Sequence, residues 1–192
     1  MPASTVSKLD YMNEIARHPN TQMLLDAWDH MISEPDSPRE IEPTRIHKDL
    51  VDSLFILEQI DGAWIFRNAG QNLPDFLGRD LADQDFLKFW TGHDRALTET
   101  LLTATVNGRR PGFMHARGET LTGQRIDIEI TLAPLLKLEK SDGPARILGL
   151  YQTLDSKQTL NGRPVWRHRI TQLLPPDGEP YPPQIRLVAS ND

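Results

Sequence analysis

Residues 53–68 read SLFILEQIDGAWIFRN, and this stretch is the strongest indicator of the fold. Residues 53–60 and 63–68 are both rich in the branched and aromatic side chains that strands favour. Asp61 and Gly62 lie between them and form a signal typical of a tight, two-residue hairpin turn. The stretch therefore predicts two antiparallel strands that pair directly with one another.

Three further strands are expected over residues 112–120, 125–132 and 146–153. The second of them, RIDIEITL, alternates apolar and polar side chains along its length. Such alternation predicts one buried face and one face in water, so we place Asp127 and Glu129 at the surface as solvated charges.

Helices are expected before and after the hairpin. Apolar side chains at helical spacing predict helices over residues 4–17, 20–33, 43–50 and 94–106. Residues 69–89 read as short helical turns joined by loops. Asn107 and Gly108, which tolerate a left-handed backbone, are expected to end the last helix.

This order of elements predicts the α+β class, with a five-stranded antiparallel sheet and helices on one face. Residues 1–42 are expected to form an N-terminal helical extension and residues 43–155 the main domain. Residues 156–192 contain many prolines and are expected to form an extended tail, within which residues 165–173 are a candidate strand.

The composition narrows the classes of function. The 192 residues carry a formal net charge of −6 and no cysteine. The acidic balance disfavours binding to nucleic acid, and no apolar run is long enough for membrane insertion. The absence of cysteine excludes disulfides and thiolate chemistry and fits a reducing environment. Because the N-terminus also lacks the pattern of a signal peptide, we expect a cytoplasmic protein.

Sequence motifs for catalysis are missing. The chain has no G-x-S-x-G motif and no glycine-rich phosphate loop. Its six histidines are scattered without the spacing of a zinc site. We therefore expect no enzyme activity, no metal and no resident cofactor, while binding of an unknown small ligand stays open.

The element order and several short motifs resemble a PAS domain. Asn68-Ala69-Gly70 follows the strand pair, and residues 76–81, FLGRDL, are similar to the short helix and Gly-Arg step of that family. Residues 91–95, TGHDR, stand where the long helix of a PAS domain begins, and residues 147–155 resemble its last strand. The resemblance implies a sensory fold with helices packed against one antiparallel sheet.

Residues 23–155 resemble more closely a bacterial single-PAS subfamily that long carried only an unknown-function label. The likeness rests on Leu25 and Trp28 in the early helix and on the segment from Arg67 to Leu81. It does not cover the last 37 residues, 156–192.

The resemblance implies a space between sheet and helices that can hold a small ligand. Aromatic side chains are the expected walls of this cavity, namely Trp64, Phe66, Phe86, Trp90, Phe113 and Tyr151. Arg67, Asn68 and His93 are the expected polar anchors. The alternative is an ordinary packed core without a ligand, because buried aromatic residues commonly serve only to pack.

The N-terminal helices carry the expected surface for protein partners. Its candidate residues are Met12, Ile15, Met23, Leu24, Trp28 and Met31. The resemblance implies that such helices flank the sheet and mediate a homodimer. Alternatively, they only cover the sheet of their own domain, although one helix can do both across a two-fold axis.

Together these observations predict a stand-alone PAS-type sensor or adaptor that acts through protein–protein contacts. A small ligand in the PAS cavity is one route by which it would be controlled. Two alternatives stay open. One is a small-molecule-binding protein or enzyme on another α+β scaffold, and the other is a structural adaptor that binds no ligand.

Overall fold

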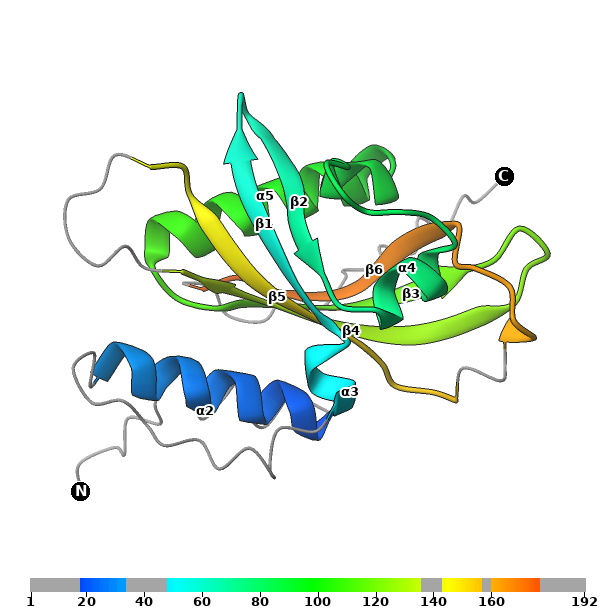
Figure 1. Cartoon of the computed structure of the whole chain (residues 1–192). Coiled ribbons are helices and arrows are strands. Elements are labelled where there is room, and N and C mark those ends of the chain that lie inside the picture. Colours follow the sequence, from blue (N-terminus) through cyan, green and yellow to red (C-terminus); the bar gives the residue numbers. More distant parts are fainter. Residues whose placement is uncertain (1–17, 34–47, 136–142, 157–159, 177–192) are drawn as a thin grey trace, which may run out of the picture.

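A computed structural model describes residues 18–33, 48–135, 143–156 and 160–176, and Figure 1 shows their arrangement. The helices are α2 (Pro19–Ser33), α3 (Lys48–Val51), α4 (Asn72–Leu77), the 3-10 helix η2 (Phe86–Phe89) and α5 (Gly92–Gly108). The strands are β1 (Leu54–Ile60), β2 (Ala63–Ala69), β3 (Gly112–Glu119), β4 (Arg125–Pro134), β5 (Arg146–Thr153) and β6 (Arg167–Leu174). The expected helix over residues 4–17 lies outside the described residues, as do residues 43–47.

The described strands form one antiparallel sheet in the order β2-β1-β5-β4-β3-β6. Asp61 and Gly62 join β1 to β2 as predicted, with the positive φ values, 49° and 83°, that a tight hairpin needs. The α+β class is confirmed, but the sheet has six strands where five were expected. The additional strand, β6, confirms the candidate strand over residues 165–173 within the expected tail, and it pairs with β3.

Helices α4, η2 and α5 cover one face of the sheet and close the main hydrophobic core. The apolar side chains of β4 point into this core as the alternation predicted, namely Ile126, Ile128, Ile130 and Leu132. Leu101 and Leu102 of α5 are completely buried against them. Burial of this apolar surface is the main stabilising contribution to the domain.

Helix α2 lies against the opposite face, where Figure 1 shows it as the blue helix across the sheet from α5. The prediction that this face of β4 meets water is therefore wrong for Glu129 and Thr131, which are completely buried, but it holds for Asp127 near the start of the strand. The indole of Trp28 donates a hydrogen bond to the Pro134 carbonyl at 3.0 Å. The part of an inner strand that helices cover on both sides has no face in water, whatever its sequence alternation suggests.

The end of α5 also differs from its prediction. Asn107 and Gly108 both lie within the helix, and the left-handed residue is Arg109, with a φ of 52°. The Arg109 N–H bonds to carbonyls of the last helical turn. Gly112, the first residue of β3, lies tightly against the Thr105 side chain. The helix therefore runs two residues further than predicted before the left-handed residue ends it.

Gly149 of β5 provides a test of how tightly the core is packed. It stands opposite Phe55 of β1, and a Cβ atom added to it would overlap the Phe55 ring. The centroid of that ring lies only 5.5 Å from the Phe66 ring and 5.6 Å from the Phe86 ring. We predict that Gly149→Ala lowers the free energy of unfolding by about 1–3 kcal/mol through overpacking, measured by urea denaturation.

The control for this prediction is the double variant Gly149→Ala/Phe55→Leu. Because leucine leaves room for the new methyl group, the double variant should lose less stability than the sum of the two single losses. Additive losses would show that the clash with Phe55 is not the cause.

Candidate functional site

The space between the sheet and helices α4, η2 and α5 is filled by its own side chains. Phe66 packs against Phe55, Phe86 and Phe89, with ring centroids 5.5, 5.7 and 5.9 Å away. The cavity that remains among these rings measures about 10 Å³. This volume holds at most one water molecule, so no organic ligand fits here without rearrangement of the core.

The structure places the predicted wall residues in two groups. Five of them are buried in the main core, namely Trp64, Phe66, Phe86, Trp90 and Tyr151. Phe113 is also fully buried, but on the face that α2 covers, where its ring centroid lies 4.9 Å from that of His115. Phe113 is therefore not a wall of the interior cavity, because strand alternation directs it to the other side of the sheet.

The three predicted polar anchors all lie at the surface. Arg67, Asn68 and His93 are exposed and do not line the interior cavity. Arg67 forms ion pairs with Glu58 at 2.7 Å and with Asp83 at 3.0 Å. The hydrogen bond from Arg67 is the main reason why the pKa of the Glu58 carboxyl lies below the usual range of a glutamate. Arg67 thus braces the β1–β2 hairpin.

Besides Trp90, the side chains with polar atoms that line the interior cavity are Tyr151 of β5 and His168 of β6. The Tyr151 hydroxyl donates to His168 Nε2 at 2.7 Å, and His168 Nδ1 donates to the Phe89 carbonyl at 3.4 Å. Burial lowers the pKa of His168 to about 4 and raises that of Tyr151 well above its usual value. The pair is therefore neutral at pH 7, and it ties β6 to the core. Sequence reasoning missed His168 because nothing marked its strand as part of the sheet.

The buried His168 makes stability depend on pH. Its pKa is lower in the folded chain than in the unfolded chain, so the unfolded state binds more protons below the ordinary value near 6.5. Stability should therefore fall as the pH falls, by about 2 kcal/mol between pH 7 and pH 5 from this group. Urea denaturation at a series of pH values measures the loss.

The variant His168→Gln isolates this contribution. It should be less stable than the wild type at pH 7, yet lose markedly less stability on going to pH 5. Staying above pH 5 avoids the ordinary titration range of carboxylates such as Glu58. An equal pH dependence in the two proteins would contradict the assignment.

A row of four polar side chains crosses the face that α2 covers. Gln172 of β6, His115 of β3, Glu129 of β4 and Gln152 of β5 stand opposite one another, strand by strand. His115 Nδ1 lies 3.1 Å from Gln172 Oε1, and His115 Nε2 lies 3.1 Å from Glu129 Oε2. We call these four residues the polar row. In the sequence Glu129 is only one of the polar residues that alternate with apolar ones along residues 125–132. Its burial was therefore not predicted.

Glu129 also holds the N-terminal end of α2. Its Oε1 atom accepts a hydrogen bond from the Thr21 hydroxyl at 2.5 Å and another from the His18 backbone N–H at 3.2 Å. A carboxylate at this end of a helix interacts favourably with the unpaired N–H groups and the helix dipole. The central charge of the sheet is thus the docking point of the helix.

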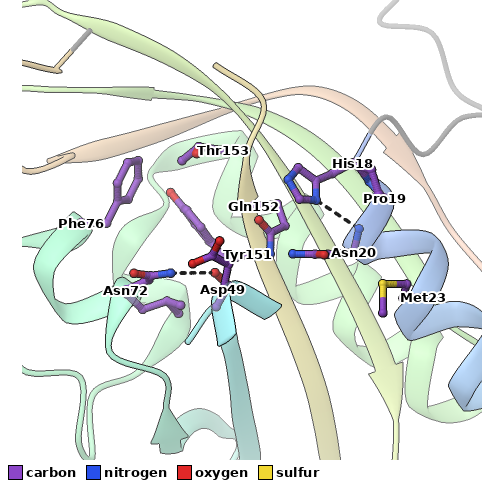
Figure 2. Close-up of a pocket in the computed structure, with 12 residues that line it drawn as sticks. His18, Pro19, Asn20, Met23, Asp49, Asn72, Phe76, Tyr151, Gln152 and Thr153 are labelled. Carbon is purple, nitrogen blue, oxygen red and sulfur yellow. Dashed lines mark hydrogen bonds between the residues drawn. The ribbon is translucent and has the colours of Figure 1, made fainter. Parts of the chain in front are cut away.

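The polar row leads into an open cleft outside the core. The cleft measures about 510 Å³ and lies between the N-terminal end of α2, helices α3 and α4, and the end of β5 (Figure 2). Asn20 of α2 and Asn72 of α4 line it from two sides, and Gln152 of the polar row also lines it. This volume is in the range that small-molecule sites in proteins have.

The described residues contain neither a candidate metal site nor a candidate membrane-spanning helix. Within residues 18–33, 48–135, 143–156 and 160–176, no group of three or more histidine, cysteine, aspartate or glutamate side chains is placed to hold a metal ion. No helix in that part of the chain is both long and apolar enough to cross a lipid bilayer.

Comparison with known proteins identifies the family. A family model described as PAS domain matches residues 16–152, so the chain belongs to the PAS domain family. A Rhodobacter sphaeroides LOV protein is 13% identical over 59% of this chain and 68% of its own, with a TM-score of 0.43. A fungal LOV domain photoreceptor is 11% identical over 77% of this chain and 100% of its own, with a TM-score of 0.44. No curated protein matches the chain.

The role of Glu129 as the docking point of α2 is testable by substitution. Glu129→Leu leaves His115 and Thr21 without their buried partner, a change that typically costs roughly 3–5 kcal/mol. We predict that the amides of α2 then exchange with deuterium at least tenfold faster, measured by hydrogen exchange with mass spectrometry.

Asp127→Asn on the same strand is the matched control. Asp127 pairs with Arg117 at the surface, where the loss of an ion pair costs about 0–1 kcal/mol. Exchange in α2 should therefore stay as in the wild type. Equal exchange in the Glu129→Leu and Asp127→Asn variants would show that Glu129 does not hold the helix.

Proposed function

We propose that this chain is a non-catalytic PAS sensor or adaptor of the cytoplasm that acts through protein–protein contacts, with helix α2 as its output element. One observation carries the proposal. The interior is closed by its own aromatic rings, whereas α2 is attached to the outer face through a small set of polar and apolar contacts. An attached helix can change its position without any change in the core.

The filled interior favours control from outside the core over a ligand in the PAS cavity. A residual volume of about 10 Å³ leaves no room for an organic molecule. The structural adaptor with a filled cavity, one of the alternatives left open by the sequence, agrees with this part of the structure. In the proposed function the core stays filled by its own side chains, and helix α2 transmits the signal.

The surface that α2 offers to partners differs from the expected one. Leu24 and Trp28 are buried against the sheet of their own domain, and Met23 faces the cleft. Met12 and Ile15 lie outside the described residues. Met31 and Ile32, at the C-terminal end of α2, are 46% and 36% exposed. We propose this end of α2 as the contact surface for a protein partner or for a second copy of the chain, because two neighbouring large apolar side chains are exposed there.

Enzymatic chemistry at the polar row is not supported by its geometry. Both nitrogens of His115 and both oxygens of Glu129 already have hydrogen-bond partners. A general base needs a free lone pair within reach of a substrate proton. The pair therefore fits a structural role better than a catalytic one.

The proposal is tested with the double variant Met31→Asp/Ile32→Asp. Two charges at this end of α2 should abolish self-association, measured by light scattering, or binding to proteins captured from the native cell. Because both side chains are exposed, the free energy of unfolding should change by only about 0.5 kcal/mol. Leu121→Asp places a charge on another exposed apolar residue, 77% exposed in the β3–β4 turn, and should leave association intact.

Two results would contradict the proposed surface. One is a wild-type chain that stays monomeric and captures no partner. The other is a double variant that associates as strongly as the wild type.

A further inference from the structure

We infer that the cleft beside α2 is a binding site for an uncharged polar organic molecule no larger than a nucleoside. The cleft is a different space from the interior cavity, although Leu73 and Tyr151 line both, and its volume of about 510 Å³ is suited to a ligand of that size. Figure 2 shows side chains of α2, α3, α4 and β5 around the same space. The claim that this ligand controls α2 rests on the proposed function. The claim that the ligand binds in the cleft does not.

The first observation is an unsatisfied amide in the cleft wall. Gln152 is only 7% exposed, and its Nε2 atom has no hydrogen-bond partner within the described part of the chain. A buried N–H group without a partner costs roughly 1–3 kcal/mol. Once the Gln152 amide turns towards the cleft, a ligand that offers a carbonyl or ring-nitrogen acceptor would remove this cost. Gln152 is therefore the expected anchor.

The second observation is the character of the other polar side chains. Asn20 lines the cleft from α2, and Asn72 lines it from α4, where its Nδ2 atom donates to the Ser53 hydroxyl at 3.2 Å. An amide offers both donors and an acceptor. Such a lining complements a molecule that presents donors and acceptors side by side, as carboxamides and nucleobases do.

The charged side chains around the cleft disfavour an anionic ligand. No lysine or arginine lines the cleft, while Asp49 does. Glu129 stands directly beside Gln152 in the polar row and adds a second negative charge behind the wall. His18, the one basic side chain of the lining, already accepts the Asn20 backbone N–H at its Nδ1 atom. A phosphate or carboxylate would therefore find no lysine or arginine to pair with and would be repelled by both acidic groups.

Apolar side chains complete the lining. Met23 of α2 and Leu73 and Phe76 of α4 face the cleft along with the amides. They offer a surface for the carbon framework or flat ring of the ligand, while the amides fix its orientation. The mixture of amides and apolar side chains fits a compact heterocycle.

The placement of the walls couples binding to α2. Asn20 and Met23 belong to α2, whereas Asn72 and Gln152 belong to the rest of the domain. A ligand that contacts both sides binds more tightly when α2 is docked, so it shifts the population of the helix towards the docked state. Glu129 already holds the same end of the helix.

Ligand-observed NMR on the full chain tests the inference with three pairs of probes. Each pair compares an uncharged molecule with an anionic counterpart: nicotinamide with nicotinate, benzamide with benzoate, and adenosine with AMP. We expect at least one uncharged probe to bind, at least tenfold more tightly than its anionic counterpart. The inference is overturned if no uncharged probe binds or if the anions bind equally well.

Substitutions assign the binding to the cleft. Gln152→Met keeps the size of the side chain and removes its donor, and it should weaken binding at least tenfold. Asn72→Ala, on the other wall, should weaken binding even if the Gln152 variant proves unstable. Gln59→Met replaces an exposed glutamine on β1 and is the matched control, with binding unchanged. Unchanged binding in both cleft variants would place the probes elsewhere and overturn the inference.

Hydrogen exchange of α2 separates this inference from the proposed function. A bound probe should slow the exchange of amides in α2 at least threefold. If a probe binds through Gln152 but leaves α2 exchange unchanged, the binding site stands and the role of α2 as the controlled output falls.

Discussion

The buried charge of Glu129 is the constraint on which the outer half of this structure depends. A carboxylate removed from water costs several kcal/mol unless it is paired and hydrogen-bonded. His115 supplies one partner, and the Thr21 hydroxyl and the His18 N–H supply two more. Two of these three partners come from the start of α2. The helix thus supplies hydrogen-bond donors to the buried Glu129 of the sheet, and Glu129 supplies an acceptor to the donors at the start of the helix. The contact is therefore specific in position.

The two faces of the sheet have different roles. On one face the aromatic rings around Phe66 close the interior, with Tyr151 and His168 joined as a neutral pair that ties the sixth strand to the core. On the other face a polar row lies below a docked helix and ends at an open cleft. A member of the PAS family with a closed interior can still respond to its surroundings, provided that the responsive element lies outside the core. In the proposed function helix α2 on the outer face is that element, and the cleft lies beside it.

The candidate site was predictable only in part, for reasons of geometry. Aromatic side chains in strands and short helices are buried in most soluble domains, so the core positions of Phe66 and Trp90 followed from their type. Glu129 carried no such signal, because an alternating strand looks the same whether or not a helix covers its polar face. The alignment of Glu129 with His115 and Gln152 depends on the register of three strands, which no local pattern contains.

From the sequence alone it was possible to determine the α+β class, the β1–β2 hairpin and its turn, the main helices and the likeness to PAS domains. These features arise from local preferences of a few neighbouring residues, such as the left-handed backbone that Asp61 and Gly62 accept. Only the tertiary structure decided that aromatic side chains fill the interior, that β6 joins the sheet and that α2 covers the polar row. These outcomes depend on which side chains from distant segments meet, and on how much space their volumes leave between them.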